Sequence, residues 1–342
     1  MTDADAPPLV RPIRTVDYHT GGEPFRIVTG GVDELEGRTV LERRRWAMAN
    51  LDDVRRLLVN EPRGHADMYG AFVTPPNDDW ADLGVVFFHN EGFSTACGHG
   101  TIALVTWAID TGRLGVPTDG SPVPVTVDVP SGRLACTARL DADHRVAAVR
   151  FRNVPSFVLA RDVTVRTQRG LLTLDVAFGG AFYGTLDVAT LGMRLTPAAL
   201  PDLIALQREL RPALERSVRV VHPDEPDLAG IYGVIFWEAL GPDEQRNVTV
   251  FADGEIDRSP CGSGTSARLA VLHARGELGL GSIFHHRSIV DSVFDAWVVD
   301  EGPTVDRHPS VITEVEGSAF RTGESLFSLD DRDPLGTGFL LR

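Results

Sequence analysis

An internal repeat constrains the fold of this chain more than any other feature of its sequence. The stretch that begins at Cys97, CGHGTIALVTWAIDTG, aligns without a gap with the stretch that begins at Cys261, CGSGTSARLAVLHARG. The two stretches lie about half of the 342-residue chain apart. Self-similarity at such a distance indicates a duplicated structural unit. Because the chain is also long for a single hydrophobic core, we expect two similar domains.

Each copy of the repeat predicts a strand, a tight glycine turn and a helix, in that order. The residues before the cysteines, VVFFHNEGF and VTVFADGEI, are strand-like. The residues after them have helical apolar spacing that ends at Gly112 and Gly276, where glycine is a suitable helix cap. Both helices are apolar on nearly every side, which predicts that they are buried. Each cysteine is therefore expected at the N-terminus of a buried helix.

The rest of the chain alternates short strands with turns, which favours antiparallel sheets. Segments such as VPVTVDVPSGRLACTARLD and GLLTLDVAFGGAFYG are typical. One amphipathic helix, TPAALPDLIALQRELRPALERSV, interrupts this pattern. We predict an α+β fold of two pseudo-symmetric domains, each a mostly antiparallel sheet wrapped around a central helix. Residues 1–155 would carry Cys97 and residues 156–324 would carry Cys261, with the active site in the cleft between the domains.

Composition excludes several classes of protein. The chain has 43% hydrophobic and 24% charged residues, and no apolar run approaches the roughly eighteen residues of a membrane span. Its formal net charge of −15, without a basic cluster, disfavours nucleic acid and anionic membranes as partners. The start of the chain, MTDADAPPLVRP, lacks the features of a secretory signal, so we expect a cytoplasmic protein. Three cysteines in a reducing compartment should be free thiols.

A helix N-terminus suits both cysteine chemistry and carboxylate binding. Its positive dipole end shifts a thiol toward thiolate, and its backbone N–H groups can hold a substrate carboxylate without arginine. Two such ends facing one cleft would place the α-carbon of an amino acid between two sulfurs. One thiolate would take the α-proton while the opposite thiol delivers a proton to the other face, which inverts the centre.

No cofactor motif accompanies the two cysteines. The sequence has no P-loop, no GxGxxG between a strand and a helix, and no lysine, since its 33 basic residues are all arginine. The lack of lysine excludes Schiff-base chemistry by a protein amine. We therefore expect no cofactor. We also expect no metal, because Cys97-x-His99 with His285 and His286 lacks the paired spacing of zinc sites.

Other interpretations of the cysteines are less favoured. Most intracellular cysteines simply fill the core, and we assign that role to Cys136, which lies in the strand-like segment RLACTARL. Cys97 beside His99 would also suit a cysteine hydrolase, but that leaves Cys261 unexplained. A duplicated amino-acid-binding protein is a further alternative, although it would not need thiols on both sides of its ligand.

Five motifs together resemble the proline racemase family, which includes proline racemases, hydroxyproline epimerases and trans-3-hydroxy-L-proline dehydratases. They are DYHTGGEPFRIV from Asp17, EPRGHADMYGA from Glu61, NEGFSTACGHGTIA from Asn90, GGAFYG from Gly179 and DRSPCGSGTSA from Asp257. The resemblance implies the fold of diaminopimelate epimerase, with the last strand, near residues 325–342, returning to the first domain.

The resemblance also assigns site residues. It implies two catalytic cysteines, Cys97 and Cys261, and a substrate-binding set made of Gly98, His99, Asp257, Gly262 and Ser263. His99 and Asp257 would lie nearest the ring nitrogen or the carboxylate of proline or a hydroxyproline. The sequence leaves the oligomeric state open, a homodimer included.

The branch of the family is less clear than the family itself. The motifs HTGGEP and EPRGHADMYGA and the ending DPLGTGFLLR are similar to the dehydratases. In that branch, however, the second cysteine is typically threonine, whereas this chain has Cys261. We therefore expect a two-cysteine racemase or epimerase, with a dehydratase that uses Cys97 as its base as the alternative.

Overall fold

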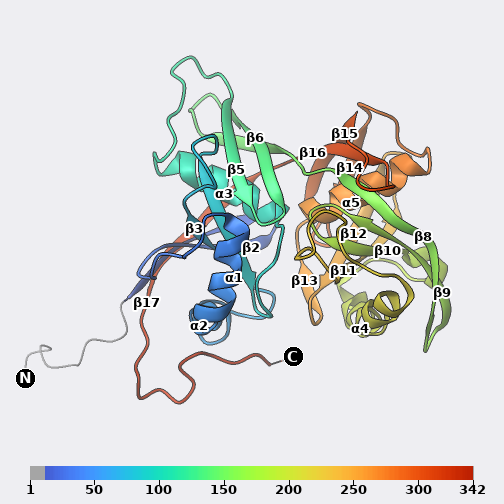
Figure 1. The fold of residues 1–342 in the computed structure, drawn as a ribbon, viewed down its shortest axis with the longest axis horizontal. Helices are drawn as coiled ribbons and strands as arrows, with labels where there is room; N and C mark the ends of the chain where they lie inside the picture. Colours follow the sequence, from blue (N-terminus) through green and yellow to red (C-terminus); the bar gives the residue numbers. More distant parts are fainter. Residues whose placement is uncertain (1–11, 342) are drawn as a thin grey trace, which may run out of the picture.

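The structure, a computed structural model, describes residues 12–341. The expectation of a cytoplasmic protein depends on the segment MTDADAPPLVRP, and nearly all of this segment lies outside the described residues. Figure 1 shows two lobes side by side. The strands are β1 (Ile13–Thr20), β2 (Glu23–Gly30), β3 (Tyr69–Thr74), β4 (Leu83–His89), β5 (Val123–Val129), β6 (Gly132–Leu140), β7 (Val146–Arg152), β8 (Ser156–Thr167), β9 (Gly170–Phe178), β10 (Phe182–Asp187), β11 (Ile231–Ala239), β12 (Glu244–Phe251), β13 (Glu255–Asp257), β14 (Ile283–Arg287), β15 (Val293–Glu301), β16 (Ser310–Gly317) and β17 (Ala319–Phe327). The helices are α1 (Val40–Asn50), α2 (Asp52–Val59), α3 (Gly98–Asp110), α4 (Leu200–Ser217) and α5 (Gly262–Ala274), with two short 3-10 turns, η1 (Val188–Leu191) and η2 (Pro197–Ala199).

Each lobe contains a mostly antiparallel sheet, as the sequence predicted. The first lobe holds β1 to β7 together with β17, and the second lobe holds β8 to β16. Parallel pairing occurs between β2 and β3 and between β4 and β5 in the first lobe, and between β10 and β11 and between β12 and β14 in the second. The expected α+β fold with two similar halves is confirmed.

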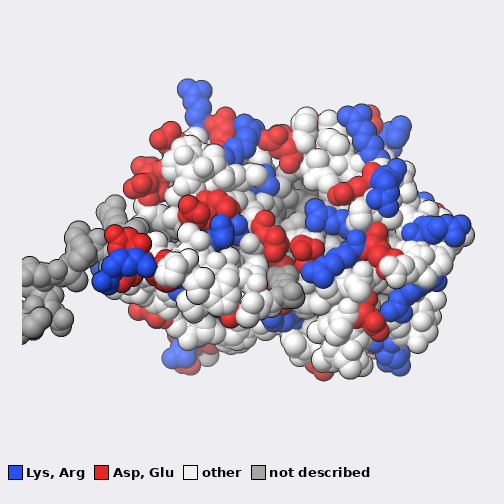
Figure 2. Space-filling view, turned by 90° about the horizontal axis from the view of Figure 1, so that it is seen from below, with Lys and Arg blue, Asp and Glu red and all other residues white. Residues whose placement is uncertain are grey.

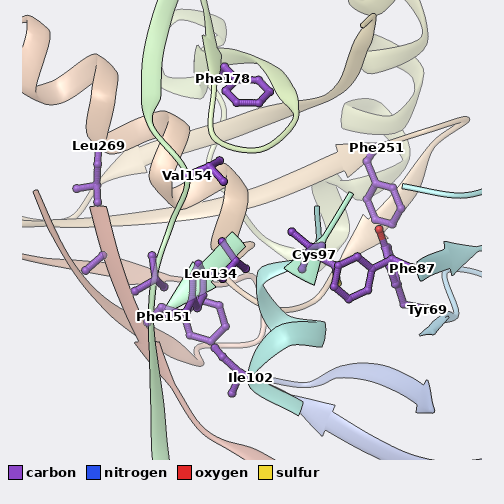
Figure 3. Close-up of a cluster of buried hydrophobic side chains, with 14 of the residues drawn as sticks. Tyr69, Phe87, Cys97, Ile102, Leu134, Phe151, Val154, Phe178, Phe251 and Leu269 are labelled. Atoms are coloured by element: carbon purple, nitrogen blue, oxygen red, sulfur yellow. The ribbon is translucent and has the colours of Figure 1, made fainter. Parts of the chain in front are cut away.

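One buried helix lies at the centre of each lobe. Helix α3 packs against β1, β7 and β17, and α5 packs against β8, β15 and β16. All but the last residue of α3 is buried, including the largest side chain, Trp107, which is 1% exposed. Burial of such apolar side chains contributes about 1.5–3 kcal/mol each, which explains why these helices need no polar face. Figure 3 shows part of this core, with Cys97 and Tyr69 among the labelled apolar side chains.

The chain passes between the lobes twice, and the strands next to the two connections are hydrogen-bonded to each other. It leaves the first lobe between β7 and β8 and returns between β16 and β17. Strand β16 pairs with both β7 and β8, while β17 pairs with β1. The return to the first lobe thus begins near residue 318, earlier than the expected 325. We propose that the two lobes are the two domains predicted from the sequence.

The surface carries charges of both signs. Figure 2 shows that it is indented between the two lobes and that acidic and basic side chains alternate around the indentation. No helix within residues 12–341 is long and apolar enough to span a membrane.

Candidate active site

The N-termini of α3 and α5 touch each other where the lobes meet. A Cβ atom added to Gly98 would lie only 2.5 Å from Gly262 Cα, and one added to Gly262 would lie 2.7 Å from Gly98 Cα. Only glycine permits two backbones to approach this closely. The two copies of the Cys-Gly-x-Gly-Thr turn therefore face each other directly, and the cysteine that precedes each glycine is brought to the same interface.

Cys97 is the N-cap of α3. Its sulfur accepts a hydrogen bond from the Gly100 N–H at 3.2 Å, and its carbonyl accepts the first intrahelical bond, from the Thr101 N–H at 3.0 Å. The imidazole of His99 lies beside the same sulfur, with Nε2 at 3.4 Å and Nδ1 at 3.6 Å. Cys97 is 5% exposed, so its thiol is almost sealed from bulk solvent.

Cys261 precedes α5 in a different backbone conformation. Its φ angle is +63°, in the left-handed region that non-glycine residues rarely adopt, whereas φ at Cys97 is −154°. The Cys261 sulfur lies 3.9 Å from the hydroxyl of Tyr183. Backbone strain of this kind is often retained at functional sites. The two thiols are thus similar in position but not in their neighbours.

Asp257 lies between the two halves of the site. Its Oδ1 accepts hydrogen bonds from the N–H and hydroxyl of Ser259 at 2.8 and 2.7 Å, and its Oδ2 lies 3.8 Å from Nδ1 of His99 in the other lobe. Burial raises the pKa of both thiols, and the charge of the Asp257 carboxylate raises both further. Asp257 is 4% exposed and His99 is 3% exposed. The structure brings together all the residues that the resemblance assigned to the site.

Sequence reasoning missed a second acid at the same interface, Glu23 of the HTGGEP motif. Its side chain is fully buried, and its Oε2 accepts a hydrogen bond from the Arg258 N–H of the other lobe at 2.7 Å. Its Oε1 has no hydrogen-bond partner within residues 12–341. Burial, followed by the charge of Asp257, raises the pKa of Glu23 well above its ordinary value. The sequence motif contains Glu23 but gives no sign that its carboxyl group is buried.

Buried hydroxyl and imidazole groups make further contacts between the lobes. Tyr69 of the first lobe and Tyr232 of the second share a hydrogen bond of 2.9 Å, and His89 Nδ1 lies 2.9 Å from Glu255 Oε1 across the same boundary. The Tyr69 ring also packs edge-on against His99, with the ring centres 5.0 Å apart. The Tyr69 ring therefore packs in the core, while its hydroxyl is part of a polar network. Buried polar groups paired in this way hold the closed interface in a single geometry.

The protonation of the thiols differs from the expectation based on helix N-termini. Burial raises the pKa of Cys97 well above its ordinary value, and this effect exceeds the lowering caused by the Gly100 N–H. Burial likewise raises the pKa of Cys261. The helix ends do stabilise thiolate, but the loss of water caused by burial outweighs them. A cationic group beside the thiols would be needed to favour the thiolate.

The remaining cysteine and histidines lie in other environments. Cys136 is buried in β6, where it pairs with Val125 and Phe151, in keeping with the core role assigned to it. His285 contacts Asp295, and His286 contacts Thr265. Burial lowers the pKa of His286 to about 3.

Comparisons with known proteins agree with this fold. A solved hydroxyproline epimerase from Agrobacterium vitis, with bound trans-4-hydroxy-L-proline, superimposes with a TM-score of 0.90 at 31% identity, covering 97% of this chain and 96% of that one. A probable proline racemase from Agrobacterium radiobacter K84, with bound carbonate, gives 0.90 at 33% identity and 96% coverage of both chains. The fold and the site therefore define an enzyme of the isomerase or hydro-lyase kind.

Sequence comparisons identify the family. The proline racemase family model matches residues 15–340. A trans-3-hydroxy-L-proline dehydratase from Bacillus cereus is 45% identical over 334 residues, which are 96% of this chain and 97% of the relative. A 3-hydroxyproline 2-epimerase from Burkholderia multivorans is 45% identical over 337 residues, which are 98% of this chain and 99% of the relative. The chain belongs to the proline racemase family.

Proposed function

We propose that this enzyme epimerises a 3-hydroxyproline at C2 by proton transfer between two cysteines. The contact between Gly98 and Gly262 carries the proposal, because it brings the two cysteine-led helix ends to one site. The substrate class is supported by the two relatives of 45% identity described above, one named a trans-3-hydroxy-L-proline dehydratase and the other a 3-hydroxyproline 2-epimerase. The absence of lysine from the sequence supports a reaction without a Schiff base.

The zwitterionic substrate supplies the charge that the site lacks. Its ammonium group would face the carboxylate of Asp257 and the carboxyl group of Glu23, and its carboxylate would accept hydrogen bonds from the first N–H groups of α3 and α5, which have no acceptor within their helices. Neutralising Asp257 removes one cause of the raised thiol pKa values. Substrate binding thereby favours the thiolate that the reaction requires.

The inversion itself needs one thiolate and one thiol. With an L-substrate, the Cys97 thiolate would remove the C2 proton while the Cys261 thiol donates its own proton to the opposite face. The C2–H bond breaks on one side, a new C2–H bond forms on the other, and the enzyme is left with Cys97 protonated. The dry site and the aligned helix N–H groups stabilise the negative charge that develops on the carboxylate.

Dehydration is the second candidate, favoured by the dehydratase relatives. In that reaction Cys97 would remove the C2 proton, the C3–O bond would break, and the hydroxide would take a proton from an acid and leave as water. A second thiol would be unnecessary for this outcome. The presence of Cys261 therefore favours epimerisation.

The proposal is tested by incubating the enzyme with proline and its 3- and 4-hydroxy isomers in deuterated water. NMR follows the hydrogen at C2, and a second assay detects the cyclic imine that dehydration forms. We expect trans-3-hydroxy-L-proline to gain deuterium at C2 and to give the C2 epimer. Cys261→Ser should lower inversion by about 10²–10⁴-fold, the usual contribution of a general acid or base. The control Cys136→Ala should stay within about twofold of wild type, since Cys136 lies in the β6 core.

Two outcomes would contradict the proposal. If every analogue kept its C2 hydrogen, the enzyme would not act at this carbon at all. If Cys261→Ser kept full turnover with loss of the hydroxyl, the enzyme would be a one-base dehydratase.

A further inference from the structure

The two cysteines differ in the polar group that accompanies each sulfur. In the first repeat, the residue two positions after the cysteine is His99, whose imidazole lies against Cys97. In the second repeat that position is Ser263, whose Oγ lies 2.7 Å from the hydroxyl of Tyr183. The same tyrosine hydroxyl lies 3.9 Å from the Cys261 sulfur. The second thiol therefore has a tyrosine, supported by serine, where the first has a histidine.

We propose that Tyr183 is a positioning residue that stabilises Cys261 in both of its protonation states. When Cys261 is a thiol, it donates a hydrogen bond to the Tyr183 oxygen. When it is a thiolate, the tyrosine hydrogen rotates toward the sulfur, while the Ser263 hydroxyl donates to the tyrosine oxygen. The inference rests on the proposed two-thiol inversion, in which Cys261 gains and loses a proton.

The surroundings hold Tyr183 in place for this role. Its side chain is fully buried on β10, between the paired strands β9 and β11. Its ring packs edge-on against Tyr232, with ring centres 5.8 Å apart and planes at 88°. On the other side, the left-handed backbone at Cys261 sets the direction of its Cα–Cβ bond. In a water-excluded site a hydrogen bond to an ionised sulfur is stronger than one between neutral groups, so a single hydroxyl has a measurable effect.

The experiment measures the reactivity of each thiol separately in Tyr183→Phe, which removes only the hydroxyl. The ligand-free protein is treated with iodoacetamide between about pH 8 and 9, quenched, and digested with trypsin. Because the chain is cleaved only at arginine, Cys97, Cys136 and Cys261 fall in separate peptides, residues 64–113, 134–139 and 259–268. Alkylation of Cys261 should be about tenfold slower than in wild type, the effect of a pKa about one unit higher. Alkylation of Cys97 should change by less than about twofold.

Tyr18→Phe is the matched control. It also removes a buried tyrosine hydroxyl, but this one donates to Asp110 at the opposite end of α3 from Cys97. Its three peptides should react as in wild type. A Cys261 rate that is unchanged or faster in Tyr183→Phe, or equal slowing of Cys97 and Cys261, would overturn the proposal. The alkylation pattern needs no turnover, so it decides the role of Tyr183 even if the hydroxyproline panel finds no inversion.

Discussion

At the scale of single residues, burial dominates the chemistry of the two thiols, because it raises the pKa of both Cys97 and Cys261. Cys97 and Cys261 could be found because a repeat marks them, and the glycines that follow could be explained by close backbone approach. The direction of the thiol pKa values could not be predicted, because it depends on how completely the lobes exclude water. Tyr183 and Glu23 lie inside the motifs GGAFYG and HTGGEP, but they were missed as site residues because nothing in these motifs shows that their side chains lie near the cysteines.

The raised thiol pKa values predict a particular pH dependence of chemical modification. Iodoacetamide should react slowly with Cys97 and Cys261 at pH 7, and the rates should still rise above about pH 9, because thiolate is the reactive form and burial disfavours it. Mass spectrometry of the tryptic peptides measures both rates. A hydroxyproline should protect both cysteines. Rapid alkylation that is independent of pH between 6 and 8 would show that the thiols are already ionised.

At the scale of elements, the structure confirms the helices whose periodicity is clear. The central helices end just before Gly112 and Gly276, both of which have positive φ angles, and α4 lies within the amphipathic segment predicted over residues 196–218. Helix α1 was not predicted, because charged residues obscure its apolar spacing. It does begin with a capping box, in which Thr39 and Glu42 cap each other's backbone N–H groups. That four-residue pattern is visible in the sequence.

The contact between the two central helices predicts a large effect from a small substitution. Gly98→Ala would place a methyl group 2.5 Å from Gly262 Cα, so the helix ends must move apart. We expect a loss of roughly 1–3 kcal/mol in the free energy of unfolding, typical of overpacking, and a fall in turnover of at least about 100-fold. Urea denaturation and the hydroxyproline assay measure the two effects.

Gly115→Ala is the comparison for this substitution, because a Cβ at Gly115 would have no atom within 4 Å. Its stability and turnover should match wild type. Wild-type turnover in Gly98→Ala would mean that the helix ends need not touch during catalysis.

At the scale of the whole molecule, the lobes are joined by polar contacts that sequence patterns do not reveal. Arg45 pairs with Asp227 at 2.6 Å on the surface, and Ser292 donates to the Gly21 carbonyl at 2.7 Å. The surface ion pair contributes at most about 1 kcal/mol. The buried contacts of Glu23 and Tyr69 should matter more, because breaking them leaves polar groups without water. Partners in such contacts come from distant parts of the chain, so only the folded structure identifies them.

The buried carboxyl group between the lobes predicts how stability changes with pH. Because the pKa of Glu23 is raised in the folded protein, its contribution is fully present below the unfolded value of about 4.3 and is lost as pH rises through the folded value. Glu23→Gln keeps an acceptor for the Arg258 N–H but has no charge. The unfolding free energy of this variant, relative to wild type, should therefore increase between about pH 5.5 and 8.

Glu42→Gln is the control for this measurement. Hydrogen bonds from the Arg38 and Thr39 N–H groups lower the pKa of Glu42, so its ionisation is complete before this range begins. Its stability relative to wild type should be constant there. A constant difference for Glu23→Gln as well would mean that Glu23 does not titrate in the folded protein above pH 5.5.

The double passage of the chain between the lobes has a consequence for how the molecule can be divided. A backbone severed between β7 and β8 would give two fragments of similar length, but the second would still end inside the sheet of the first, through the pairing of β17 with β1. The pairing of β16 with β7 would hold the same boundary from the other side. The two halves are thus interlocked rather than merely linked, because the first fragment alone lacks β17, a strand of its own lobe.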